Sequence, residues 1–112
     1  MSAQAQISTD VIVQRLIAAG EPRKIYLFGS RAGNRSDKQP HNRSDYDLLI
    51  VEKSDLDRSA RAEAYYRAVS DLPVEVDIIV VTPEEIKEWA QVPQAFITTA
   101  IREGRTLYER QD

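Results

Sequence analysis

Three segments of the chain carry residue types that could together act on a phosphorylated substrate. A Gly-Ser-Arg turn at 29–31 follows an apolar run, Asp45-Tyr46-Asp47 comes after the mainly polar residues 32–44, and Asp77 stands inside a second apolar run. Backbone N–H groups at a glycine turn bind phosphate, and neighbouring carboxylates bind a divalent cation. Transfer of a nucleotidyl group needs both, because the triphosphate charges must be neutralised before a nucleophile can approach. The ordered set predicts this chemistry, whereas no single segment is specific for it.

The turn at Gly29 and Ser30 follows Lys24–Phe28, an apolar and aromatic segment that predicts a short β-strand. Glycine can adopt backbone angles that are closed to other residues, so the turn can expose consecutive N–H groups. If a helical turn begins at Ser30 or Arg31, these groups lie at its positive end, where a terminal phosphate would bind. Taken alone, the Gly-Ser pair is more simply a strand-to-helix corner with Ser30 as the N-cap.

Asp45 and Asp47 open a second predicted strand, which runs to about Val51. Side chains alternate along a strand, so both carboxylates are expected on one face and the apolar residues between them and after them on the other. Mg²⁺ suits this arrangement, because it takes one or two carboxylates together with waters and phosphate oxygens. A bare Asp-x-Asp is also explained if Asp45 closes a turn and Asp47 decorates a solvated strand end.

Asp77 interrupts the third predicted strand, Val74–Val81, which is otherwise mostly apolar. An ionised carboxylate in a largely buried strand is costly unless it is paired or bound to a metal. A salt bridge to an arginine would explain it equally well. The observation that favours a site is the joint occurrence of the turn, the paired carboxylates and the third carboxylate on three successive strands.

The ordered set resembles the minimal nucleotidyltransferase (MNT) domains of the DNA polymerase β superfamily, especially the antitoxins of HEPN/MNT toxin–antitoxin pairs. In that family a Gly-Ser turn precedes an Asp-x-Asp strand, and a third carboxylate follows on a later strand. The resemblance covers nearly the whole chain, from the first helix to the last short strand. It implies that Asp45 and Asp47 ligate two Mg²⁺ ions, and that Asp77 helps to hold the catalytic metal and acts as the base on the acceptor hydroxyl.

The nucleotide contacts follow from the same resemblance, with two departures from the family pattern. Gly29 and Ser30 would hold the triphosphate of ATP. Where the family often has an arginine after the alanine of the turn, this chain has Gly33, so Arg31 or Arg35 would supply that contact. The connection to the Asp-x-Asp strand is also longer than usual, but an insertion in an exposed loop costs little free energy and leaves both strand ends in place.

The other expected elements are helices over Ser8 or Thr9 to Ala19, Leu56–Ser70, Pro83–Ala90 and Pro93–Gly104, and a last strand over Arg105–Glu109. The order predicts an α/β protein of the α+β kind, in which a mixed β-sheet has helices packed mainly on one face and carboxylates on the other. The family resemblance implies that this is the nucleotidyltransferase fold. A doubly wound parallel sheet would fit the alternation of elements, but the turn lacks the glycine and lysine patterns of those folds.

In the helix expected over residues 56–70, the side chains predicted to face the sheet are those of Leu56, Ala60, Ala64 and Val69, together with either Tyr65 or Tyr66. The arginines of this helix at positions 58, 61 and 67 are predicted to form a solvated face. Trp89 is expected to be half-buried packing, although an exposed tryptophan there would suit a partner interface.

The bulk properties fit one small cytoplasmic domain spanning residues 1–112. The net charge is −3, with fifteen basic and eighteen acidic residues, so stable nucleic-acid binding is not expected. The absence of cysteine excludes disulfides and thiolate metal sites, and the single His41 cannot form a zinc site alone. No stretch resembles a signal peptide or a membrane span.

The functional hypothesis is transfer of AMP from ATP, with Mg²⁺, to a hydroxyl group. Since a domain this short has little surface to enclose an acceptor, another chain is expected to supply it. The family resemblance implies a tyrosine of a HEPN ribonuclease toxin, which AMP would silence. Two alternatives stay open: an antitoxin that neutralises its partner by binding alone, and transfer to a small hydroxylated molecule. The nucleotide preference and a homo- or hetero-oligomeric state are not predicted.

Overall fold

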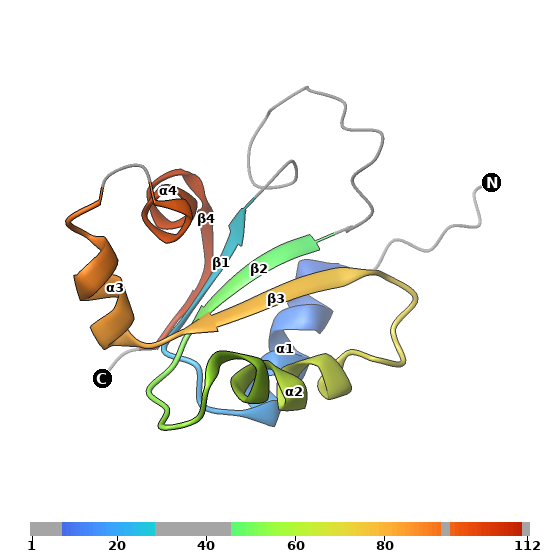
Figure 1. Ribbon diagram of the computed structural model, residues 1–112. Coiled ribbons are helices and arrows are strands. Elements are labelled where there is room, and N and C mark those ends of the chain that lie inside the picture. The colour runs from blue at the N-terminus through green and yellow to red at the C-terminus, as the bar shows by residue number, and fades with distance from the viewer. Residues whose placement is uncertain (1–7, 29–45, 93–94, 111–112) are drawn as a thin grey trace.

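The computed structural model describes residues 8–28, 46–92 and 95–110, which form four helices and four strands (Figure 1). The helices are α1 (Thr9–Ala19), α2 (Arg58–Ala68), α3 (Pro83–Trp89) and α4 (Phe96–Glu103). The strands are β1 (Lys24–Phe28), β2 (Tyr46–Val51), β3 (Val76–Val81) and β4 (Arg105–Glu109).

The strands form one mixed sheet in the order β3-β2-β1-β4. β1 is antiparallel to both β2 and β4, whereas β2 and β3 are parallel. A parallel pair needs a crossover connection, and α2 provides it between the end of β2 and the start of β3. The predicted α+β class and mixed sheet are confirmed.

The central strands bury apolar side chains on both faces of the sheet. On one face, Leu48, Ile50 and Val80 pack with residues of α1 and α2. On the other face, strand residues pack with Ile97 and Ala100 of α4. Figure 1 shows α1 and α2 on one side of the sheet and α3 with α4 on the other. The two longer helices, α1 and α2, therefore share one face of the sheet, and the two shorter helices, α3 and α4, lie on the face that carries the carboxylates.

Local signals placed most helix ends correctly. The side chain of Ser8 accepts a hydrogen bond from the N–H of Val11 at the start of α1. Thr82 and Glu85 form the predicted capping box at the start of α3. α4 begins at Phe96 rather than at Pro93, and residues 93–94 lie outside the described ranges.

The interior face of α2 differs from the prediction. The helix begins after Asp57, which caps it, so Leu56 lies before the helix and is 57% exposed. Ala64 is also exposed, and the buried positions are Ala62 and Tyr65. The expected pairing of a buried with an exposed tyrosine is confirmed, because Tyr66 lies on the outside. Val69, at the end of the helix, is buried as predicted. The prediction was wrong for Leu56 and Ala64, because alanine and arginine are poor indicators of the buried face.

Among the helices of the described ranges, none has the length and apolar character needed to cross a membrane.

Candidate functional site

Asp47 and Asp77 are direct partners in the parallel pairing of β2 with β3. Residues in register on neighbouring strands point to the same face, and the two strands lie about 5 Å apart. Both carboxylates therefore lie on one face of the sheet, close enough for one or two cations to contact both. The structure brings these two predicted site residues together.

Phe28 completes a row across three strands, because it is the partner of Asp47 in the antiparallel pairing of β1 with β2. Phe28 is the last residue of β1, so this end of the strand lies beside the aspartate. We call Phe28, Asp47 and Asp77 the carboxylate row. The end of β1 therefore lies beside Asp47, and the predicted approach of the turn itself stays a prediction.

The four other predicted site residues, Gly29, Ser30, Arg31 and Asp45, lie outside the described ranges. Their proposed roles stay predictions. Within residues 8–28, 46–92 and 95–110, no group of three metal-binding side chains is found. Asp45, the first aspartate of the predicted pair, is not among those residues, and in the sequence it directly precedes β2.

The burial argument for Asp77 was wrong. Asp77 is exposed and Asp47 is only half-buried. The reason is the position of β3, which is an edge strand whose second residue is Asp77. Solvent access spares this carboxylate a large desolvation cost.

The donor set of the row fits a hard divalent cation. Carboxylate oxygens are the ligands that Mg²⁺ takes alongside phosphate oxygens and water. Two carboxylates in register on one accessible face can contribute such ligands without burying charge. Asp47 and Asp77 would hold the ion, with Asp45 as the further predicted ligand.

An aromatic pair adjoins the carboxylate row. The rings of Phe28 and Phe96 meet edge to face, with centroids 5.2 Å apart and planes at 78°. Phe96 is the first residue of α4 and is 52% exposed. Sequence reasoning did not single out Phe96, because its contact with Phe28 spans most of the chain and no local pattern reports it.

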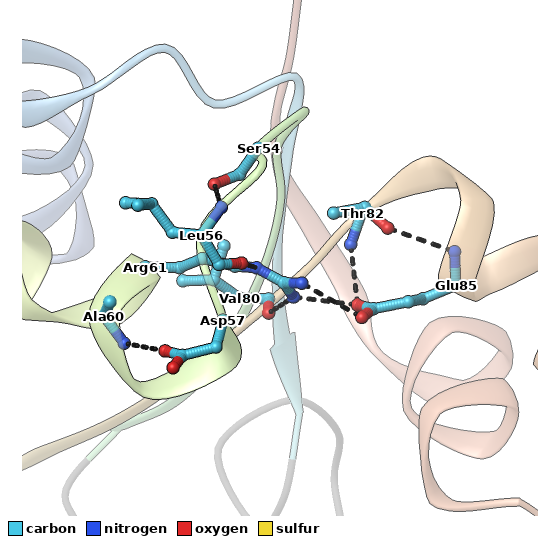
Figure 2. A network of polar contacts seen from close by, with 8 residues as sticks. All are labelled: Ser54, Leu56, Asp57, Ala60, Arg61, Val80, Thr82 and Glu85. Carbon is cyan, nitrogen blue, oxygen red and sulfur yellow. Dashed lines mark hydrogen bonds and ion pairs between the residues drawn. The ribbon is translucent and has the colours of Figure 1, made fainter.

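The far end of β3 carries a network centred on Arg61 (Figure 2). The two Nη atoms of Arg61 donate to the two carboxylate oxygens of Glu85, at 2.8 and 3.1 Å. Arg61 also donates to the backbone carbonyls of Val80, at 3.1 Å, and of Leu56, at 2.7 Å. Its side chain is only 9% exposed, so the prediction of a solvated face was wrong for this arginine.

Glu85 connects this network to the helix cap. Its carboxylate accepts from the guanidinium of Arg61 and from the N–H of Thr82, and these bonds hold the pKa of Glu85 below its ordinary value. The network ties the start of α2 to the end of β3 and to the start of α3. It supports the sheet from the end opposite to the carboxylate row.

The comparisons with known proteins agree with this architecture. The profile of the family described as polymerase beta nucleotidyltransferases matches residues 11–112. No curated protein sequence gives a significant match.

Three solved structures share the fold. Two are crystal structures of the MntA–HpeT toxin–antitoxin complex, one with a tyrosine-to-alanine change and one with two aspartate-to-glutamate changes. The first has a TM-score of 0.58 and 22% sequence identity, and the match covers 95% of this chain and 76% of that chain. The second has a TM-score of 0.57 and 23% sequence identity, and the match covers 94% of this chain and 76% of that chain. The third is a Sulfolobus solfataricus protein provisionally named a nucleotidyltransferase. It has a TM-score of 0.59 and 23% sequence identity, and the match covers 91% of this chain and 78% of that chain.

Proposed function

Since the chain belongs to the polymerase beta nucleotidyltransferase family, we propose that it transfers AMP from ATP to a hydroxyl group with Mg²⁺ as cofactor. The observation that carries this proposal is the register of Asp47 with Asp77. It gives two carboxylates on one face of the sheet, one exposed and one half-buried, beside the end of β1.

Each predicted site residue has a role in this reaction. Gly29, Ser30 and Arg31 bind the triphosphate through backbone N–H groups, a hydroxyl and a guanidinium. Asp45 and Asp47 would hold the Mg²⁺ ion through their carboxylate oxygens. When bound, Mg²⁺ supplies neutralisation of the phosphate charge.

Asp77 accepts the proton of the acceptor hydroxyl. The hydroxyl oxygen then forms a bond to the α-phosphorus, the bond from this phosphorus to the bridging oxygen breaks, and pyrophosphate leaves with the electron pair. The exposed position of Asp77 on the edge strand suits the role of base, because an acceptor on another molecule has to reach it.

We further propose that residues 1–112 form one minimal domain acting in the cytoplasm as an antitoxin. The acceptor is a tyrosine of a cognate HEPN ribonuclease. The similarity to the MntA–HpeT structures supports a toxin as the partner. Neutralisation by binding alone is the second candidate, favoured by Gly33 and by the long connection before Asp45.

The test is incubation of the purified protein with α-labelled ATP and Mg²⁺, with and without the product of the neighbouring gene. We expect label on the partner with the wild type, and at least about a 100-fold lower transfer rate with Asp47→Asn or Asp77→Asn, because several kcal/mol of charge stabilisation are lost. Asp55→Asn is the matched control, since Asp55 is an exposed carboxylate in the connection after β2. Its transfer rate should match the wild type.

The outcome also separates the candidates. A partner that binds the wild type without gaining label, and that is still neutralised when both Asp45 and Asp47 are changed to asparagine, would show an antitoxin that acts by binding. Label that moves only to a small hydroxylated molecule would contradict the proposed protein acceptor.

A further inference from the structure

We infer that the pocket beside Phe96 receives the purine base of the nucleoside triphosphate. This inference rests on the proposed function and adds to it a binding site for the part of the substrate that does not react. The pocket has a volume of about 180 Å³ and is lined by Arg58, Trp89, Ala95, Phe96 and Ile97.

The position of the pocket is the first argument. Phe96 lines it and also contacts the ring of Phe28, which is the register partner of Asp47. Asp47 shares its sheet face with the residues that pack against α4. Phe96 therefore connects the pocket to the carboxylate row through Phe28, and Arg58 lines the pocket from the start of α2. A nucleotide with its phosphates at the row would extend its base past Phe28 toward this pocket.

The exposure of the rings is the second argument. Phe96 is 52% exposed and Trp89 is 39% exposed. Ile97, on the side of α4 that packs against the sheet, is only 5% exposed. Ile97 is thus part of the buried core, and the two aromatic rings keep surface available for contact. Aromatic side chains of this kind stack on nucleobases, and every base offers a face for stacking.

The pocket is also held in place by the chain itself. The hydroxyl of Thr98 donates to the backbone carbonyl of Trp89, at 2.9 Å, and this bond joins the end of α3 to α4. Arg58 approaches from the start of α2 and brings a guanidinium that can stack on a π system. A base entering a preformed pocket loses less entropy than one that must order its site.

The decisive experiment measures affinity for ATP and for inorganic tripolyphosphate by calorimetry in the presence of Mg²⁺, using the full chain. In Phe96→Ala we expect ATP affinity to fall by roughly 5- to 100-fold, the range expected for loss of one base–aromatic stack. Tripolyphosphate affinity should stay within about twofold, because the phosphate contacts lie elsewhere. Phe96→Tyr keeps a ring and should retain ATP affinity, which separates stacking from a general loss of packing.

Trp89 provides an independent readout, because it is the single tryptophan of the chain. Its fluorescence should be quenched by ATP and GTP, less by CTP, and unchanged by tripolyphosphate. Val92→Ala is the matched control, since Val92 is 43% exposed near the same connection but does not line the pocket. Its ATP affinity should equal that of the wild type.

The failures are distinguishable. Wild-type binding of ATP with no change in Phe96→Ala would overturn the base site and leave the proposed function standing. Failure of the wild type to bind either ATP or tripolyphosphate would overturn both. Unchanged Trp89 fluorescence with ATP, combined with quenching when the toxin partner is added, would show that the pocket receives the partner instead.

Discussion

At the start of β3 an exposed carboxylate lies beside a half-buried one, whereas at its end the same strand leads into a buried threonine and a buried guanidinium. Asp77 and Asp47 leave charge accessible to a ligand, while Arg61 uses its donors on Glu85 and on backbone carbonyls. At the Arg61 end the polar groups are largely buried and bond to one another, whereas at the other end Asp77 is exposed and Asp47 is half-buried. The comparison separates residues that hold the helices to the sheet, which we call the frame, from residues that belong to the candidate site.

The outer edge of β3 belongs to the frame. The hydroxyl of Tyr66 accepts from the N–H of Ile78, at 2.8 Å, and donates to its carbonyl, at 3.4 Å. Arg61 caps the carbonyl of Val80 two residues later. Side chains of α2 therefore occupy backbone groups that an edge strand would otherwise offer to another chain.

The strongest test of this division is Arg61→Ala. Removing the guanidinium leaves the partly buried carboxylate of Glu85 without its charge partner and two backbone carbonyls without their donor. We expect a loss of about 3 kcal/mol in the free energy of unfolding, measured by chemical denaturation. Arg67→Ala is the matched control, because Arg67 is an exposed arginine of the same helix, and its effect should stay within about 0.5 kcal/mol. Equal losses in the two variants would contradict the distinction.

A smaller loss is expected for Tyr66→Phe. The change keeps the ring but removes both hydrogen bonds to Ile78 on the edge of β3. The unfolding free energy should fall by about 1 kcal/mol. Light scattering at high concentration should show whether the uncovered edge also promotes association. A variant as stable and as monodisperse as the wild type would show that the hydroxyl has no protective role.

The smallest effect concerns pH. Hydrogen bonding to Arg61 holds the pKa of Glu85 below its ordinary value of 4.5. Its folded pKa is lower than its unfolded one, so the stabilisation is fully present above the unfolded pKa and is lost as the pH falls through the folded pKa. Glu85→Gln should therefore flatten the acid part of a stability curve measured from pH 7 to pH 3.

Asp71 offers a contrast to Glu85, because its pKa is also lowered by hydrogen bonding to Arg15 but both side chains are exposed. The effect of Asp71→Asn on the curve should shrink in 0.5 M salt, since exposed pairs are screened. The effect of Glu85→Gln should persist. Equal salt sensitivity would argue that the Arg61 network is solvated.

Much of the frame could be predicted because its signals are local. The cap at Ser8 and the capping box at Thr82 and Glu85 each depend on residues three positions apart. The alternation in β2 and β3 placed Asp47 and Asp77 on the face opposite to the side chains that pack with α1 and α2. Such patterns are set by the geometry of a single helix or strand.

The rest depended on contacts between distant segments. The burial of Arg61 follows from the position of α3, and the exposure of Asp77 follows from the edge position of β3. The contact of Phe28 with Phe96 joins β1 to a helix near the other end of the chain. No spacing within a short window carries that information.

The parallel register of β2 with β3 makes the candidate site sensitive to the parity of an insertion. Suppose that one residue is inserted within β3 after Asp77 and that the apolar side chains after it keep their places in the core. Successive side chains alternate between the faces, so Asp77 would then point toward α1 and α2. Inserting two residues would return the carboxylate to its own face, one step further along. Variation in strand length should thus be tolerated in pairs of residues, whereas the crossover through α2 can change length one residue at a time.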